Sequence, residues 1–130
     1  MTKGKRFSLL IDCAKEARLK AYAPYSRFKV GAAVLAKSGN IYTGCNVENA
    51  SYGLTVCAER NAVAAMAAAG EREITAVAVV TDLKNPAAPC GACRQVIAEF
   101  GPHADIVMAG LKGKVRVESL SGLLPRQFKI

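Results

Sequence analysis

The sequence has 130 residues, of which 52% are hydrophobic and 22% charged, and its net charge is +8. This length and apolar content predict one folded domain over residues 1–130 with a substantial core, and they exclude a small scaffold held together only by disulfides. The basic residues fall in short, scattered groups without interleaved aromatic side chains, so we expect a solvated basic surface and no nucleic-acid partner.

The first predicted element is a helix over residues 8–20, where small and apolar residues recur at helical spacing. Pro24 follows it, and the residue before a proline avoids the helical conformation. The apolar stretch Phe7–Ile11 is interrupted by Asp12 and is too short for a signal-peptide core or a membrane span. We therefore expect a cytoplasmic protein with no membrane partner.

The rest of the chain alternates between strand and helix patterns. In order, we predict strands over residues 28–36 and 41–46 joined by a hairpin-type turn at 37–40, an alanine-rich helix over 57–69, a strand over 74–81, a helix over 91–100, strands near 105–109 and 114–117, and a helical turn around 119–124. The run at 74–81 is continuously apolar, which is typical of a strand covered on both faces. This order predicts an α/β layered sandwich.

Three of the five cysteines form a pattern suited to a metal ion. Cys90 and Cys93 are three residues apart at a predicted helix start, so they point to the same side, and Cys57 stands at the start of another predicted helix. Helix N-termini offer free N–H groups and a positive dipole end, which stabilise thiolates. Three thiolates suit tetrahedral Zn²⁺ and leave its fourth position for water, as in a catalytic site.

Glu59 follows Cys57 by two residues, within the first turn of the same predicted helix. If the metal lies beyond the helix end, both side chains can converge on it, and a carboxylate there can take a proton from water and later return it. Spacing alone leaves open a structural zinc site completed by His103, Cys45 or Cys13. Otherwise we expect the two cysteines to be packing residues and His103 to lie at the surface.

The segments Cys57-Ala58-Glu59 and Pro89-Cys90-Gly91-Ala92-Cys93 resemble the motif of the zinc-dependent deaminases of cytosine and adenine bases. The segments at 25–33, 44–50 and 123–125 are similar to those of the small, homotetrameric cytidine deaminases, so the resemblance covers nearly the whole chain. It implies a three-layer αβα sandwich around a mixed five-stranded sheet and one Zn²⁺ per chain. It also implies hydrolysis of cytidine and deoxycytidine to uridine or deoxyuridine and ammonia, a reaction of pyrimidine salvage.

The resemblance further implies roles for individual residues. Cys57, Cys90 and Cys93 would bind zinc, and Glu59 would act as the proton shuttle. The nucleoside would be contacted by Phe28, Asn46, Glu48 and the backbone of Ala58 within one subunit, and by Ala50, Tyr52 and Phe128 reaching in from a neighbouring subunit of a homotetramer. Arg60 would donate hydrogen bonds to the thiolates and withdraw negative charge from the zinc ligands.

Three other functions share part of these features. A polynucleotide-editing deaminase needs an open groove with stacking aromatics and a phosphate track, none of which stands out. A deaminase of another cytosine compound, such as a nucleoside antibiotic, is disfavoured by Asn46 and Glu48, because their separation by two puts both on one face of an extended segment that can grip a ribose diol. The third is a basic, zinc-stabilised nucleic-acid-binding module. The favoured partner is a small-molecule nucleoside.

Overall fold

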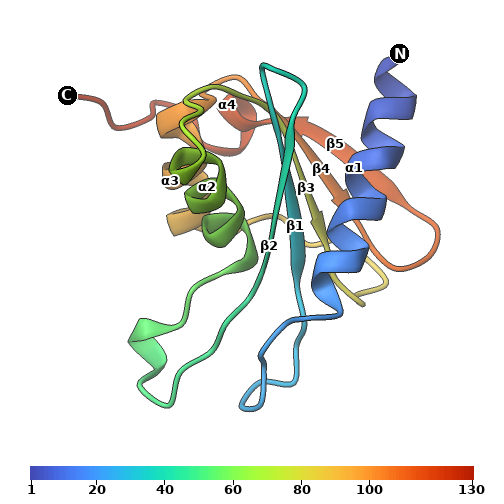
Figure 1. The fold of residues 1–130 in the computed structure, drawn as a ribbon, viewed down its shortest axis with the longest axis vertical. Coiled ribbons are helices and arrows are strands. Elements are labelled where there is room, and N and C mark those ends of the chain that lie inside the picture. Colours follow the sequence, from blue (N-terminus) through green and yellow to red (C-terminus); the bar gives the residue numbers. More distant parts are fainter.

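The computed structural model describes residues 1–130 as a five-stranded sheet with helices on both faces (Figure 1). The elements in chain order are α1 (Lys3–Arg18), β1 (Gly31–Ala36), β2 (Ile41–Cys45), the 3-10 helix η1 (Tyr52–Leu54), α2 (Ala58–Ala68), β3 (Ile74–Val80), α3 (Gly91–Phe100), β4 (Asp105–Ala109), β5 (Val115–Ser119) and α4 (Leu120–Leu123). The strand order is β2-β1-β3-β4-β5. β3 and β4 pair in parallel and the other neighbours are antiparallel, so the sheet is mixed.

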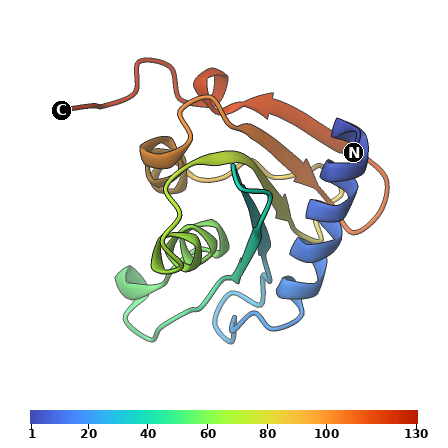
Figure 2. The same ribbon diagram turned by 45° about the horizontal axis from the view of Figure 1, so that its top comes forward.

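The helices divide the molecule into three layers. α1 covers one face of the sheet, here called the α1 face, and α2 and α3 cover the opposite one, here called the site face (Figure 2). The predicted three-layer α/β sandwich is therefore confirmed. No helix has the length and apolar character needed to cross a membrane.

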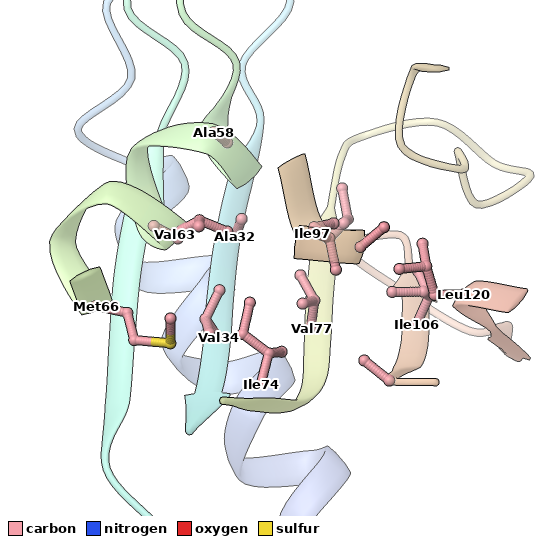
Figure 3. Packing of buried hydrophobic residues seen from close by; sticks show 14 of the residues in the cluster. Ala32, Val34, Ala58, Val63, Met66, Ile74, Val77, Ile97, Ile106 and Leu120 are labelled. Carbon is pink, nitrogen blue, oxygen red and sulfur yellow. The ribbon is translucent and has the colours of Figure 1, made fainter. Parts of the chain in front are cut away.

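Each face has its own hydrophobic core. On the site face, Val63 and Met66 of α2 and Ile97 of α3 pack against β1, β3 and β4 in a cluster of 16 buried residues (Figure 3). On the α1 face, Leu10 and Ala14 belong to a cluster of 10 buried residues. β3 contributes to both clusters, which confirms the prediction that it is covered on both sides.

Two glycines let the helices lie directly on the strands. A Cβ atom at Gly44 of β2 would lie 2.5 Å from the carbonyl oxygen of Ala58 at the start of α2. A Cβ atom at Gly31 of β1 would overlap the carbonyl oxygen of Ala14 in α1. Real Cβ atoms cannot approach so closely, so both positions require glycine for close packing. The first turn of α2, which carries Glu59, is thus set by contact with the backbone of β2.

The first helix is longer at its N-terminus than predicted. α1 begins at Lys3, five residues before the expected start, because the Thr2 hydroxyl caps it by accepting a hydrogen bond from the backbone N–H of Lys5 at 3.2 Å. It ends at Arg18 instead of residue 20. The expected second helix loses its first residue, since Cys57 is its N-cap, and ends one residue early.

The strand expected from Phe28 begins only at Gly31. The side-chain amide of Asn46 explains the difference, because it donates to the carbonyl oxygen of Phe28 at 2.7 Å and accepts from the N–H of Val30 at 2.9 Å. Some of the backbone groups expected to bond a neighbouring strand are thus bonded by a side chain instead. The other shifts are at ends of elements: β2 stops before Asn46, β5 extends over 115–119 instead of 114–117, and α4 covers only 120–123.

Two long loops lie together at one end of the sheet. They connect α1 to β1 and β2 to α2, and both extend beyond the sheet at the lower end of Figure 1. Tyr22 joins them, because its N–H donates to the carbonyl of Asn46 at 2.9 Å and its carbonyl accepts from the N–H of Glu48 at 2.8 Å. This end of the sheet is also where β3 finishes, the edge at which α/β proteins usually bind ligands.

Candidate active site

Three thiols converge where the N-termini of α2 and α3 meet. Cys57 is the N-cap residue of α2, Cys90 is the N-cap of α3, and Cys93 lies in the first turn of α3. Neither N-cap side chain makes a capping hydrogen bond within its own helix. The three sulfur atoms lie within 4.8 Å of one another. Their spacing and their position at two positive helix ends fit a single tetrahedral metal ion.

No other histidine, cysteine or carboxylate joins this group of ligand atoms. His103 is exposed in the loop after α3, as predicted. Cys13 and Cys45 line a separate cavity of about 440 Å³ between α1 and β2. The arrangement therefore does not support a structural site with a fourth protein ligand.

The electrostatics of the site favour a thiolate at Cys57 first. A hydrogen bond from Cys93, supported by the Arg60 guanidinium, lowers the pKa of Cys57 to about 5. The same contact, followed by burial, raises the pKa of Cys93, so the first negative charge belongs to Cys57. Arg60 Nη2 lies 3.4 Å from Cys57 Sγ, as the sequence predicted for a charge-withdrawing donor. Soft thiolates of this kind are the donors that Zn²⁺ prefers, and the residues present fit that ion.

Glu59 lies beside the thiols but outside the ligand group. It belongs to the first turn of α2 and its exposed fraction is only 5%. Burial, the largest cause, raises the pKa of its carboxyl above the ordinary value. A buried carboxyl that is not a metal ligand can exchange a proton with a group in the site.

The thiols open into a cavity of about 250 Å³. Its lining includes four of the residues predicted to contact a nucleoside, together with Glu59 and two of the thiols: Phe28, Asn46, Glu48, Ala58, Glu59, Cys57 and Cys90. Other cavities of the molecule are larger, so size alone would not identify this one. This cavity is identified as the candidate site because three thiols, a buried carboxyl and two polar side chains converge on it.

Asn46 and Glu48 are held in place by the loop that precedes β1. The Glu48 carboxylate accepts hydrogen bonds from the N–H groups of Tyr25 and Ser26, at 2.9 and 3.1 Å, and from the Ser26 hydroxyl. These bonds, led by the one from Ser26, lower the pKa of Glu48. One N–H of the Asn46 amide and one acceptor position on Glu48 Oε2 are left without a protein partner.

Three predicted residues lie outside the cavity of their own chain. Ala50 is exposed in the loop before α2, and Tyr52 is 75% exposed and lines a neighbouring hollow with Tyr25. Phe128 is 74% exposed and lines a cavity between α3 and the C-terminal segment. Within one chain, none of the three lines the cavity next to the thiols.

Several lining residues escaped the sequence reasoning. Ser26, Thr55 and Thr81 contribute polar side chains to the cavity wall, and Ala87 and Ala88 form part of its rim. Thr81 could have been found, because it directly follows β3 at the carboxyl edge where ligands bind. Ser26 gave no local signal, since its importance comes from contact with Glu48, 22 residues away.

A three-thiol metal centre at two helix N-termini, beside a buried glutamate on an α/β sandwich, defines the class of zinc-dependent hydrolytic deaminases. The family model described as the cytidine and deoxycytidylate deaminase zinc-binding region matches residues 5–109, and the chain belongs to this family. The family and the thiol cluster together give one Zn²⁺ per chain as the cofactor.

Relatives named cytidine deaminase match almost the full chain. A cytidine deaminase of Halalkalibacterium halodurans is 50% identical over 121 residues, which are 92% of either chain. A cytidine deaminase of Mycobacterium tuberculosis is 43% identical over 122 residues, covering 94% of this chain and 89% of its own. The crystal structure of cytidine deaminase from Burkholderia pseudomallei matches with a TM-score of 0.91 and 53% identity, covering 98% of this chain and 100% of that one. The resemblance found in the sequence is confirmed.

Proposed function

We propose that this protein hydrolyses the 4-amino group of cytidine and deoxycytidine, giving uridine or deoxyuridine and ammonia. The observation that carries this proposal is the buried carboxyl of Glu59 next to the three thiols, facing a cavity lined by Asn46 and Glu48. The relatives named above, which are cytidine deaminases, support the choice of substrate.

In the proposed reaction, bound zinc supplies a Lewis acid that makes water nucleophilic at neutral pH. The Glu59 carboxylate accepts the proton of the attacking water as a C4–O bond forms, and it delivers a proton to ring nitrogen N3. It then takes the remaining proton from the new C4 hydroxyl and passes it to the 4-amino group, so that the C4 carbonyl forms as the C4–N bond breaks to release ammonia. Burial raises the pKa of Glu59 above the ordinary carboxyl value, which favours its role as a group that both accepts and returns a proton.

The remaining lining residues would orient the nucleoside. A ribose hydroxyl is both donor and acceptor, which matches the free N–H of Asn46 and the free acceptor position of Glu48. Phe28 supplies an aromatic surface for the base or sugar. Ala58 is the first residue of α2, so its backbone N–H has no partner within the helix and can meet the pyrimidine edge.

Metal analysis combined with an ammonia-release assay tests the proposal. We expect one zinc per chain and ammonia release from cytidine and deoxycytidine, with none from a cytosine-containing oligonucleotide. Ammonia release from the oligonucleotide alone would favour a polynucleotide deaminase. A zinc-loaded protein inactive on every cytosine substrate would contradict the proposed chemistry.

We also propose that the protein is a cytoplasmic homotetramer in which Ala50, Tyr52 and Phe128 of one subunit complete the site of another. Their absence from their own chain's cavity supports this assembly, as does the exposure of the apolar side chains Tyr52 and Phe128. Ala64, Ala65 and Ala68 form an exposed strip of small residues on α2, which suits close packing against a second copy. All five cysteines are free thiols, as a reducing compartment requires.

Removal of residues 126–130 tests the shared site. We expect the truncated protein to keep its zinc, because no ligand is removed, and to lose turnover and substrate affinity together. Sedimentation at the assay concentration gives the size of the active species. A fully active monomer would contradict the shared site without affecting the proposed chemistry.

A further inference from the structure

Arg94 connects the metal-binding segment to the C-terminal part of the chain. It directly follows Cys93 in α3 and is half-buried. Its Nε donates a hydrogen bond to the carbonyl oxygen of Pro89 at 2.7 Å, and its Nη1 donates to the carbonyl oxygen of Leu123 at 2.9 Å. One planar guanidinium thus holds the residue immediately before Cys90 and the last residue of α4.

The segment that Arg94 holds has few other polar attachments, although Pro89 is buried. Between residues 84 and 89 the only hydrogen bond within the protein is the one that Pro89 accepts from Arg94. Cys90 itself is exposed, and its side chain makes no capping bond. The Cys90 carbonyl accepts the N–H of Arg94 at 3.0 Å where α3 begins, so this ligand is held from the helix side by the Arg94 backbone and from the loop side by the turn that the Arg94 guanidinium closes.

Helix stability does not account for a cation at this position. Arg94 lies near the N-terminus of α3, whose first turn contains no acidic residue. A positive charge there is opposed by the positive end of the helix dipole. Arg94 also forms none of the ion pairs of the structure. What it does gain is two short hydrogen bonds to carbonyl groups that no other side chain satisfies.

We propose that Arg94 is a positioning residue that keeps Cys90 at zinc-binding distance from Cys93 and Cys57, and thereby slows the loss of zinc. Without it, the 84–89 segment has no hydrogen bond to the rest of the protein, so the turn before Cys90 is held by the packing of the buried Pro89 and the Cys90 thiol can move away from the other two ligands. Groups that orient metal ligands typically change metal affinity by about 10- to 100-fold when they are removed. The inference rests on zinc binding and is independent of the substrate.

The test measures zinc release from the purified holoenzyme into an excess of a chromogenic chelator. Arg94→Gln removes the fork of donors, and Arg94→Lys keeps the charge but cannot serve two carbonyls in fixed geometry. Arg72→Gln is the matched control, because Arg72 Nη1 also donates to two carbonyls, those of Ala67 and Glu71 at 2.8 and 2.9 Å, at the opposite end of α2 from the thiols. Thermal unfolding of the zinc-free and zinc-loaded forms accompanies each measurement.

We expect zinc release to accelerate about tenfold or more in Arg94→Gln, less in Arg94→Lys, and not at all in Arg72→Gln. Zinc should also raise the unfolding temperature of Arg94→Gln less than that of the unchanged protein. If Arg94→Gln does not fold, Arg94→Lys decides by the same criteria. Release at the unchanged rate, or equal acceleration in Arg72→Gln, would overturn the proposal. Activity on cytidine is not part of the measurement, so failure of the proposed function would leave this result interpretable.

Discussion

The two faces of the sheet are covered in different ways. On the α1 face, a single helix of 16 residues packs over the strands and contributes nothing to the active-site cavity. On the site face, two shorter helices of 11 and 10 residues direct their N-termini at one point. That face buries the Glu59 carboxyl and leaves the Nε of Arg60 buried without a hydrogen-bond partner.

The two faces differ in whether their buried residues serve mainly folding or also the chemistry of the site. Buried charge and an unsatisfied donor are unfavourable for folding, so they persist where function requires them. On the α1 face the packing is mainly apolar, and the largely buried Arg18 guanidinium is paired, because it donates to the carbonyl oxygen of Lys29 at 3.1 Å and lies 3.8 Å from the Asp82 carboxylate. We therefore expect substitutions on the site face to change zinc binding or activity, with or without a loss of stability, and substitutions on the α1 face to change stability alone.

The largest effect is expected for Cys93→Ala on the site face. Cys93 is fully buried and is one of only three ligand atoms, so its removal should abolish zinc binding and reduce deaminase activity to background. Metal analysis and the ammonia assay measure the two losses, and circular dichroism checks that the sheet and helices remain. Full zinc content in an active variant would exclude Cys93 from the ligand set.

Glu59→Gln should preserve zinc and fold while removing most of the turnover. Glutamine has nearly the same shape but cannot accept a proton, and groups of this kind contribute about 10²- to 10⁴-fold. Steady-state kinetics with cytidine, normalised to zinc content, gives the effect. If more than about a tenth of the activity remains, Glu59 is not the proton shuttle.

Leu10→Ala tests the α1 face. Leu10 is fully buried, so its truncation should lower the free energy of unfolding by about 2–5 kcal/mol. Zinc content and kcat of the remaining folded protein should not change.

Ile97→Ala is the matched variant on the site face. Ile97 is as buried as Leu10 but belongs to α3, whose N-cap and first turn carry two of the zinc ligands. Denaturant unfolding and zinc-release rates should show equal destabilisation and faster zinc loss only for Ile97→Ala.

The smallest effect concerns Glu71, beyond the C-terminal end of α2. Hydrogen bonds from Ser38, Tyr42 and Asn40 lower the pKa of its carboxyl below the ordinary value of 4.5. Because the folded pKa is the lower one, this stabilisation is present above the ordinary value and is lost as the pH falls through the folded pKa. Carboxyl-detected NMR titration should show the low pKa, and Tyr42→Phe should move it upward without altering turnover at neutral pH. An unshifted Glu71 would show that these bonds do not persist in solution.

Residues placed by a motif or by a marked helix start could be predicted from the sequence, even though Cys57 and Cys90 lie 33 residues apart. Cys57, Cys90 and Cys93 converge as expected, and Arg60 contacts Cys57, because each lies at or near a helix start that the sequence marks. The layers of the sandwich were likewise predictable, since the alternation of strands and helices is strong. The ends of the elements were harder to predict. The N-cap residue of α1, Thr2, lies among polar residues, where no helical repeat of apolar residues marks the start of the helix.

Residues placed by side-chain contacts that no motif marks could not be predicted. The strand expected at Phe28 is displaced by the Asn46 amide, 18 residues away. Arg94 gave no signal at all, because its partner Leu123 is 29 residues further along the chain. In these cases the competing interaction is a side chain that replaces a backbone partner, and neither propensity nor periodicity contains that information.

The alanines of the sheet have a consequence for the conformational entropy of the site. Around the point where Gly31 and Gly44 let the helices touch the strands, the buried positions are mostly alanine, including Ala32 and Ala33 of β1 and Ala58 and Ala62 of α2. An alanine side chain has no rotamers, so ordering it on folding costs almost no side-chain entropy. It also has no alternative rotamer to adopt afterwards. The buried alanines at the start of α2 therefore have a single side-chain arrangement, and at these positions the support of the helix turn that carries Glu59 can move only with the backbone.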